Sequence, residues 1–599
     1  MKGLDRKPVS AILAVGGCVA FCALAVILFV TPPASGYEFT VYQGYPLAFW
    51  LLVLVGLLLS QFVVLRKALL GDDSVANLWR VSLATIVAIE AVLFLLPYYR
   101  GYRAYGRADV QTHIGYIKSI DELGHLAHDV YPNIHTLTLT ISYATGIDPL
   151  SVINSVAVVI PVFSVLAWYA LVTRLYDRDR ALLTLPFAML FVGEGAYVNP
   201  SPFVQSAVLV PFVLYLFVRE RQTRTLAVRV TLLVAVVGIT IYHPLTTLFL
   251  IFGLAAYVVI TKARDHDLLE PMTLGWGTTT GNGTLHLMTG LFVSWYYSAW
   301  VIQSKTESAL RPLLGYTGGQ SQLGEYSSTV QETSPKLTDL LLVGFTDYGI
   351  SALLFGITVL YLVVAGYRFV TERTRPRGYE MWFAVTATAF FGVSLLFLLV
   401  DMPTGWGRPL MMVRLFGVLL CGPLFYYLYQ MGDTYRIVTV GLTFCVLFYT
   451  VVGVVGLYDS RLQAQASQQV TDAEVEGMQW FFDHRSQEPG IVNHGISANR
   501  FADAYYGVNR SSSREFLGPT SGPPIHYSYD RNRTLASSYE TDQYVIIVPR
   551  GRQFHREMYP SYRDQWKYEP RDFETLNRDP AVGRVYDGGG VTVYRVTAE

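Results

Sequence analysis

The most informative candidate residues for a reaction lie in one polar stretch, residues 98 to 151. Asp109 and His113 lie four residues apart there, so in a helix they share one face. An ionised Asp beside a His can accept the proton of a hydroxyl group that attacks an anomeric carbon. Asp109 could also bind Mg²⁺ or Mn²⁺ through oxygen, or it could serve only as the N-cap of the helix.

Histidines are dense in this stretch, which holds four of the 11 in the chain. Their spacing matches no zinc pattern, so hydrogen-bonded or solvated side chains are the simpler interpretation and a transition-metal site is the alternative. The four cysteines stand in apolar runs without CxxC spacing, which indicates neither a disulfide framework nor a zinc site. The residues concerned are His113, His125, His128, His135, Cys18, Cys22, Cys421 and Cys445.

Two arginines, Arg408 and Arg414, lie at the boundary of a late apolar run. An arginine inside a membrane costs about 2.5 to 3.5 kcal/mol on insertion scales, so it needs a partner. The guanidinium group forms paired hydrogen bonds with phosphate, which makes a lipid phosphate one candidate. An ion pair with Asp401 and snorkelling of the side chain to the interface are the alternatives.

Three further polar residues interrupt apolar runs, namely Glu90, Glu194 and His243. The two carboxylates could line a cavity or pair with a polar neighbour. His243 precedes a proline, so it either faces the same cavity or marks the end of a helix. The loop at 303 to 348 has the length and polarity of a lid over a site, and no single residue in it stands out.

The elements that position these residues follow from the composition. Apolar residues make up 52% of the 599 residues and charged residues 15%, against about 25% charged in soluble domains. The mean hydropathy is +0.35, so the chain is predicted to be a membrane protein. Its 45 basic and 45 acidic residues balance, which argues against a nucleic-acid partner.

A membrane-spanning helix needs about 20 mostly apolar residues, and about thirteen such runs are present. The first follows a basic stretch, but its length exceeds the roughly 7 to 15 apolar residues of a signal peptide, so we interpret it as a retained span. Residues 227 to 261 fit either two short spans or one re-entrant hairpin. The runs cover 11–30, 46–65, 79–97, 152–173, 181–197, 203–218, 227–241, 244–261, 284–302, 349–370, 381–400, 411–430 and 436–457.

Clusters of Arg and Lys fall in every second loop between these runs, which sets the orientation by the positive-inside rule. With a cytoplasmic N-terminus all the clusters are cytoplasmic, while the loops 98–151 and 303–348 and the tail lie outside. We therefore expect a multi-pass protein of the cell membrane. The clusters are Arg66 and Lys67; Arg174, Arg178 and Arg180; Arg219, Arg221, Arg224 and Arg229; Lys262 and Arg264; and Arg368, Arg373, Arg375 and Arg377.

The tail after residue 457 is polar and has no run long enough to span a membrane. Thr471 and Glu474 have the spacing of a helix capping box, and residues 544–548 and 591–596 are typical of strands. The prediction is two domains. An all-α polytopic membrane domain covers residues 1–457, and a small extracytoplasmic α/β domain covers residues 458–599.

The outer loop carries a recognisable pattern before the next span. It reads D-x-x-x-H, then a Gly, then Y-P-x-x-H-x-L, at Asp109, His113, Gly124, Tyr131, Pro132, His135 and Leu137. This pattern and the layout of the chain resemble the GT-C superfamily of polytopic membrane glycosyltransferases, which take sugars from polyprenyl-phosphate donors. The layout is similar to that of archaeal mannosyltransferases that use dolichyl-phosphate mannose and, more distantly, of the catalytic subunits of oligosaccharyltransferases.

The chain also departs from that pattern. Oligosaccharyltransferases carry their acidic motif after the first span and a W-W-D-Y-G motif in the soluble domain. Here the acidic loop follows the third span, and residues 493–497 read N-H-G-I-S. The departures favour transfer of one sugar over transfer of a whole glycan to asparagine.

The expected reaction moves a single sugar, with mannose as the first candidate, from a dolichyl or polyprenyl phosphate to an exported glycan or glycoprotein, with inversion. Asp109 would be the general base. The alternatives are a multi-pass transporter, which usually shows internal repeats that are not evident here, and a non-catalytic scaffold for cell-envelope glycan assembly. Expected substrate contacts are His113, His135, Arg408, Arg414, Glu194 and His243.

Overall fold

A computed structural model describes most of the chain. The described residues are 6–70, 77–107, 109–126, 131–190, 198–264, 282–298, 303–304, 307–308, 311, 321–374, 376–400, 402, 404–431, 435–511 and 519–598.

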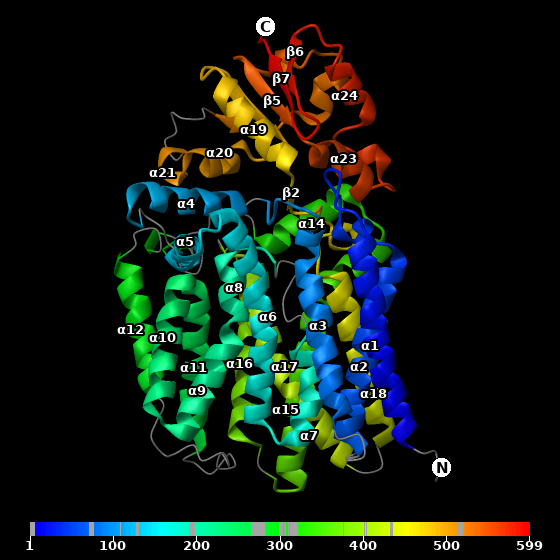
Figure 1. Cartoon of the computed structure of the whole chain (residues 1–599), viewed down its shortest axis with the longest axis vertical. Coiled ribbons are helices and arrows are strands. Elements are labelled where there is room, and N and C mark those ends of the chain that lie inside the picture. The colour runs from blue at the N-terminus through cyan, green and yellow to red at the C-terminus, as the bar shows by residue number, and fades with distance from the viewer. Residues whose placement is uncertain are drawn as a thin grey trace.

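Long helices form a bundle, and a mixed α/β unit caps one end of it (Figure 1). Within the described residues, ten helical stretches are long and apolar enough to cross a membrane, so this is a multi-pass membrane protein. The bundle consists of α1 (Arg6–Val30), α2 (Leu47–Leu70), α3 (Leu78–Tyr99), α6 (Pro149–Leu175), α7 (Arg178–Ala188), α8 (Pro202–Val208), α9 (Val210–Thr223), α10 (Leu226–Tyr242), α11 (Pro244–Arg264), α12 (Asn282–Ser298), α15 (Leu337–Thr371), α16 (Gly378–Leu399), α17 (Gly407–Gln430) and α18 (Tyr435–Val455).

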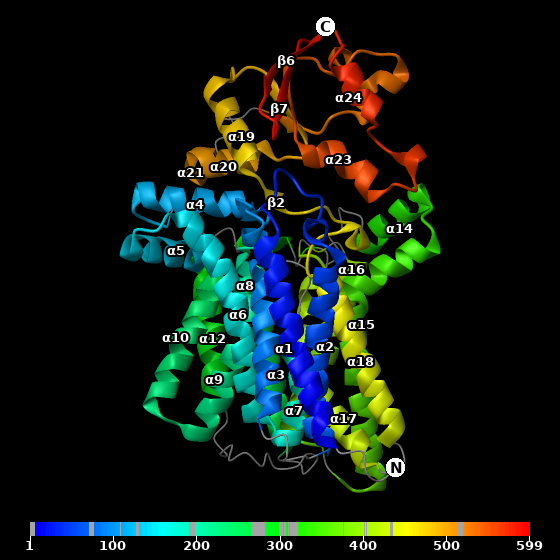
Figure 2. The same ribbon diagram turned by 45° about the vertical axis from the view of Figure 1, so that its right-hand side comes forward.

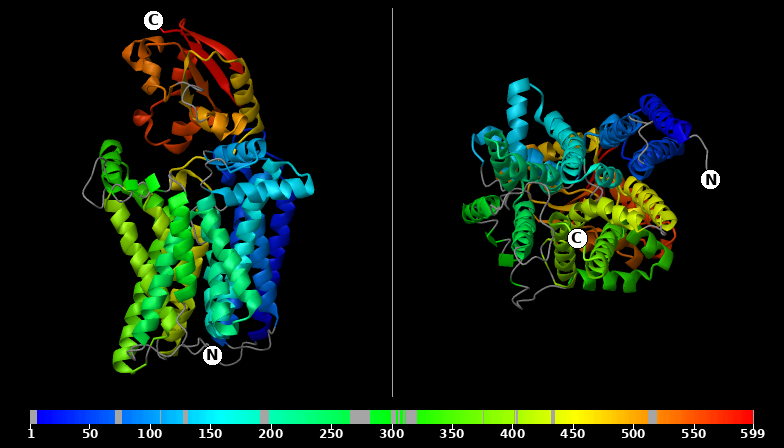
Figure 3. Two further views of the ribbon diagram at one scale, coloured as in Figure 1. Left: turned by 90° about the vertical axis from the view of Figure 1, so that its left-hand side faces the viewer. Right: turned by 90° about the horizontal axis from the view of Figure 1, so that it is seen from below.

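Each of the thirteen expected runs contains bundle helix. Three of them meet helices shorter than a full span, because α7 has 11 residues and α10 and α12 have 17 each. His243 alone separates α10 from α11. Both helices run along the bundle side by side (Figures 1 and 3), so the stretch 227–261 forms two antiparallel helices and not a re-entrant hairpin.

Helix α17 is the centre of the bundle. In its most apolar window 94% of the residues are buried, and α7, α15, α16 and α18 pack around it. A small residue allows one of these contacts, since a Cβ on Gly417 would lie 3.1 Å from Leu354 of α15. Both arginines that the sequence singled out, Arg408 and Arg414, belong to this central helix.

The region after α18 folds around a five-stranded sheet of order β4-β3-β5-β7-β6. Strand β3 is parallel to β4 and β5, and the other pairs are antiparallel. The capping box of Thr471 and Glu474 and the two expected strands, now β5 and β7, are confirmed. The elements are α19 (Asp472–His484), β3 (Gly490–His494), α20 (Ala498–Tyr506), α21 (Val508–Ser511), β4 (Thr520–Ser521), β5 (Gln543–Ile547), α23 (Pro549–Met558), α24 (Pro570–Leu576), β6 (Val582–Asp587) and β7 (Thr592–Val596).

A two-stranded ladder ties this α/β unit to the bundle. Strand β1 (Ala104–Tyr105), which follows α3, pairs antiparallel with β2 (Gln469–Val470), which precedes α19. Beside the ladder, the buried guanidinium of Arg107 donates to both carboxylate oxygens of Glu474, at 2.9 and 2.5 Å. The stretch after the third span is therefore held against the α/β unit at its very start.

Candidate functional site at the capped end of the bundle

Two short helices lie across the capped end of the bundle. They are α4 (Asp109–Leu123) and α5 (Pro132–Thr145), and both lie between the bundle and the α/β unit (Figures 1 and 2). The apolar side of α4 faces protein. Ile117 and Ile120 are buried in one cluster with residues of α5, α6 and α10, so α4 packs onto the helices below it.

Asp109 is the first residue of α4, and its side chain is 57% exposed. One of its oxygens lies 3.3 Å from the guanidinium of Arg500 in α20. The same guanidinium donates to the hydroxyl of Thr112 at 2.8 Å, and Thr112 donates to Asp503 at 2.6 Å. The exposed carboxylate therefore sits at the seam between α4 and the α/β unit.

His113 of α4 and His135 of α5 form a buried pair between the two helices. Their ring nitrogens Nδ1 and Nε2 lie 3.0 Å apart, and Tyr116 stacks on His135. Burial, followed by the neighbouring His135 and Arg500, holds the pKa of His113 well below its ordinary value, so this imidazole is neutral. The hydrogen bond between the two rings joins α4 to α5.

The described residues do not fit a Mg²⁺ or Mn²⁺ site at Asp109. Among the residues that the structure describes, no three His, Cys, Asp or Glu side chains gather as metal ligands. The group that faces Asp109 most closely is the positive guanidinium of Arg500, which disfavours a divalent cation at the same oxygen.

A second cluster lies below α5, where the α10–α11 turn meets α8 and α17. The ring of His243 stacks on Tyr131 at 4.9 Å and touches the edge of Phe203 at 5.2 Å. The guanidinium of Arg408, an exposed residue at the start of α17, lies over the Phe203 ring at 5.0 Å. An exposed guanidinium on an aromatic shelf at the end of a span is well placed to bind an anion.

The first loop and the second cluster meet through Asn199. A Cβ on Gly106, which has a φ of +112°, would lie only 2.2 Å from the side-chain oxygen of Asn199. Asn199 stands three residues before the start of α8, which carries Phe203. The segment just before Asp109 therefore packs against the turn that leads into α8. Helix α8 carries Phe203, the ring that contacts Arg408.

Arg414 has a different environment from Arg408. It is 2% exposed, and it donates to the hydroxyl of Ser351 at 2.6 Å and to the carbonyl oxygen of Asp347 at 2.9 Å, both in α15. The structure does not bring the two arginines to one site, because Arg408 faces α8 and Arg414 faces α15. Glu194 lies outside the described residues.

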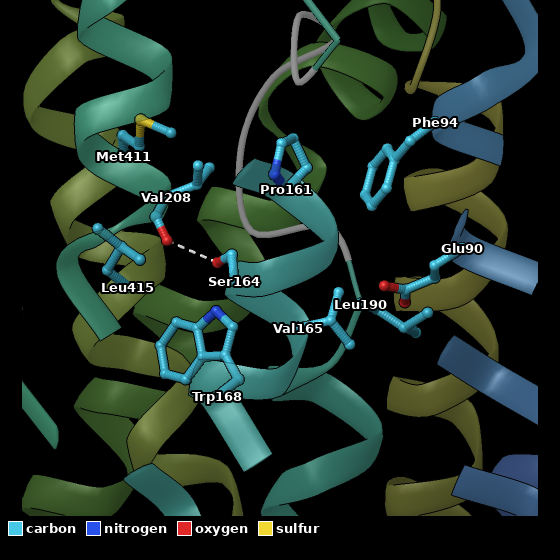
Figure 4. A pocket seen from close by; sticks show the side chains of 10 residues that line it. All are labelled: Glu90, Phe94, Pro161, Ser164, Val165, Trp168, Leu190, Val208, Met411 and Leu415. Atoms are coloured by element: carbon cyan, nitrogen blue, oxygen red, sulfur yellow. Dashed lines mark hydrogen bonds between the residues drawn. The ribbon is translucent and has the colours of Figure 1, made fainter. Parts of the chain in front are cut away.

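Glu90 of α3 points into a small cavity of about 20 Å³ in the bundle (Figure 4). It is 1% exposed, and neither carboxylate oxygen has a hydrogen-bond partner among the described residues. The other polar wall residue, Ser164 of α6, donates to the carbonyl oxygen of Val208. Met411 also lines the cavity, one helical turn after Arg408 in α17, so the cavity lies deeper in the bundle than the Arg408 shelf.

Part of the expected lid lies close to that shelf. Helix α14 (Gln322–Thr333) reaches Trp406, two residues before Arg408, because Gln322 accepts from the Trp406 backbone at 3.3 Å. The indole nitrogen of Trp406 donates to the hydroxyl of Tyr326 at 3.4 Å. A displacement of α14 would therefore break these two hydrogen bonds to Trp406, which lies at the start of α17.

A larger cleft of about 350 Å³ opens between α4, the start of α6, α19 and α20. Its walls are mainly apolar, with Lys118, Asp121 and Asp148 among the charged residues that line it, and Asp109 is not one of its lining residues. The cleft therefore lies on a different side of α4 from the exposed carboxylate.

Sequence reasoning missed Arg500, Phe203 and Asn199. Arg500 lies 391 positions from Asp109 in a tail of unremarkable composition, and no local pattern marks it. Tyr131 belongs to the Y-P-x-x-H motif, but the motif does not predict that its ring stacks on His243.

No family model matches the sequence, and no curated protein matches it significantly. Several solved structures are similar in backbone. The oligosaccharyltransferase of Archaeoglobus fulgidus in the apo form has 11% sequence identity and a TM-score of 0.42, with 78% of this chain and 70% of that chain covered. ArnT from Cupriavidus metallidurans bound to undecaprenyl phosphate has 10% identity and a TM-score of 0.44, with 87% and 98% covered.

The archaeal oligosaccharyltransferase AglB of A. fulgidus, in complex with an inhibitory peptide and a dolichol-phosphate, has 10% identity and a TM-score of 0.40, with 79% of this chain and 71% of that chain covered. Oligosaccharyltransferases are among the enzymes that the sequence pattern resembles. At these identities and TM-scores, the similarity says nothing about the activity or the substrate of this chain.

Proposed function

We propose that this protein is a membrane glycosyltransferase that transfers one sugar from a polyprenyl- or dolichyl-phosphate donor to an exported glycan or glycoprotein. The observation that supports the proposal is the pair of exposed, opposite charges at one end of the bundle. The carboxylate of Asp109 lies on a helix across that end, and the guanidinium of Arg408 lies at the start of a central span. The motif around Asp109 supports the donor class, and mannose as the sugar rests on the sequence resemblance alone.

The reaction follows from these two charges. The acceptor hydroxyl attacks the anomeric carbon, the bond from that carbon to the phosphate oxygen breaks, and the configuration inverts. Asp109 takes the hydroxyl proton as general base. Arg408 binds the lipid phosphate, whose negative charge increases as it leaves, and a charge contact that strengthens in the transition state accelerates the step. Arg414, held by α15, supports the helix that carries Arg408.

The test uses membranes or purified protein with labelled polyprenyl-phosphate sugars. Asp109→Asn removes the base with little change of shape and should lower transfer by about 100- to 10,000-fold. Arg408→Gln should lower it by about 100- to 1,000-fold. Matched controls are Asp121→Asn, an exposed carboxylate on the same helix, and Arg368→Gln in α15, and both should leave transfer unchanged. Full transfer by Asp109→Asn, or solute flux in proteoliposomes without any lipid-linked sugar, would contradict the proposal.

A further inference from the structure

The α/β unit reaches the carboxylate of Asp109 with a charged side chain. Arg500 of α20 is the positive group in contact with this carboxylate, with Nη2 and Oδ1 3.3 Å apart. Its second nitrogen, Nη1, donates to Thr112 one turn further along α4. The guanidinium thus bridges two positions on one face of α4 and fixes the direction from which it meets Asp109.

We propose that Arg500 is a positioning residue for Asp109, so that the α/β unit is part of the active site and not only a cap on the membrane domain. The inference rests on the proposed function, because it gives Arg500 a role only if Asp109 acts as the base. In this arrangement the guanidinium contacts Oδ1 and holds the carboxylate in one orientation. The second oxygen, Oδ2, accepts the proton of the acceptor.

The backbone fixes Arg500 in place. Helices α4 and α20 approach closely at Gly115, where a Cβ would lie 2.4 Å from the backbone oxygen of Asp503. Gly507, with a φ of +84°, ends α20 against Ser119 of α4. Ser511 of α21 and Thr112 of α4 both donate to the carboxylate of Asp503. These hydrogen bonds hold α20 against α4.

Three neighbouring ionisable groups have partners or surroundings of their own among the described residues. Arg107 is buried in its ion pair with Glu474 of α19, Asp503 accepts from Thr112, and burial keeps His113 neutral. Removing Arg500 takes away the positive group that contacts Asp109 in the described part of the chain. Both members of the pair are about half exposed, and such exposed pairs add little to stability, so we expect the fold to tolerate the change.

The experiment compares Arg500→Ala, Arg500→Lys and Arg510→Ala in the full-length protein, with kcat and KM measured separately for transfer from the labelled lipid-phosphate sugar. Arg510 lies 3.7 Å from Glu122 and joins the same two regions, which makes it the matched control. Arg500→Ala should lower kcat by about 10- to 100-fold with little change in the KM for the lipid donor, because the carboxylate loses the contact that orients it. Arg500→Lys, which keeps a positive group, should recover part of the lost kcat, and Arg510→Ala should change neither quantity.

A double variant separates this inference from the proposed function. If Arg500 acts through Asp109, Arg500→Ala should cause no further loss in an Asp109→Asn background. An unchanged kcat in Arg500→Ala, or losses that multiply in the double variant, would overturn the role of Arg500 while Asp109 remains the base. Full activity of Asp109→Asn alone would instead overturn the proposed function. Thermal unfolding that is equal for Arg500→Ala and Arg510→Ala shows that the loss is not one of folding.

Discussion

At the scale of single residues, two buried carboxylates in the membrane bundle have opposite surroundings. Glu380 of α16 accepts hydrogen bonds on Oε2 from Tyr361 at 2.7 Å and Tyr427 at 2.8 Å. In the part of the chain that the structure describes, Glu90 of α3 has no hydrogen-bond partner on either oxygen. Glu90 interrupts an apolar run, so the sequence indicates that it is buried. Glu380 lies just before the run 381–400, and no local pattern shows the tyrosines on other helices that donate to it.

The pair gives a prediction on stability. Glu90→Met should leave the free energy of unfolding unchanged or raise it by up to about 1 to 3 kcal/mol, because it removes unsatisfied buried acceptors. Glu380→Met should lower it by about 1 to 3 kcal/mol, because two tyrosine hydroxyls lose their acceptor. Chemical unfolding in detergent micelles measures both. A destabilised Glu90→Met variant would mean that the Glu90 carboxylate is stabilised in the folded protein.

At the scale of elements, the contact between α4 and α20 depends on a residue without a side chain. A Cβ at position 115 would lie within 2.6 Å of two backbone atoms of Asp503. Neither atom belongs to a flexible side chain, so the two helices must move apart to accommodate it. Asp109 and Arg500 are carried by these same helices, and their separation would change with the helix contact.

Gly115→Ala should therefore act on both docking and activity. We expect a cost of about 1 to 3 kcal/mol in the contact between the helices, the usual range for overpacking, with faster amide hydrogen exchange in α20 and reduced transfer. Hydrogen exchange followed by mass spectrometry checks the first effect. Gly356→Ala in α15 is the control, since a Cβ there meets no atom within 4 Å. Unchanged exchange in α20 of the Gly115→Ala variant would show that the helices adapt without separating.

At the scale of the whole molecule, the sequence predicted what is local. The membrane runs and the capping box of Thr471 and Glu474 depend on residues close together in the chain, and both are present in the structure. The same Glu474 also receives Arg107 from 367 positions away, and no local pattern indicates that pairing. For the same reason the sequence could nominate Asp109 and Arg408, whose roles remain proposals, but could not find Arg500 or the separation of Arg414 from Arg408.

The junction between the bundle and the α/β unit contains a titratable group. Asp459, just after α18, accepts from the hydroxyl of Tyr105 at 3.0 Å, and its backbone oxygen accepts from Thr40. Burial raises the pKa of Asp459 from 3.8 to about 6, although Tyr105 and the nearby Arg550 act in the opposite direction. The native carboxyl therefore holds its proton more tightly than the unfolded chain does, and ionising it in place costs stability.

The sign of the pH effect follows. Between pH 3.8 and about 6 the native state binds more protons at this residue than the unfolded state, so its contribution to the free energy of unfolding falls as the pH rises, by up to about 3 kcal/mol in total. Asp459→Asn should remove this fall and should be more stable than the parent protein at pH 7. His494 and His555, whose pKa values burial lowers to about 4, titrate with the opposite sign. Both histidines are present in the parent protein and in the Asp459→Asn variant. Their contributions therefore cancel when the two curves of unfolding free energy against pH are subtracted. Asp472→Asn, a change at an exposed carboxylate of the same region, should leave the difference near zero, and an Asp459→Asn difference that stays flat from pH 4 to pH 7 would refute the prediction.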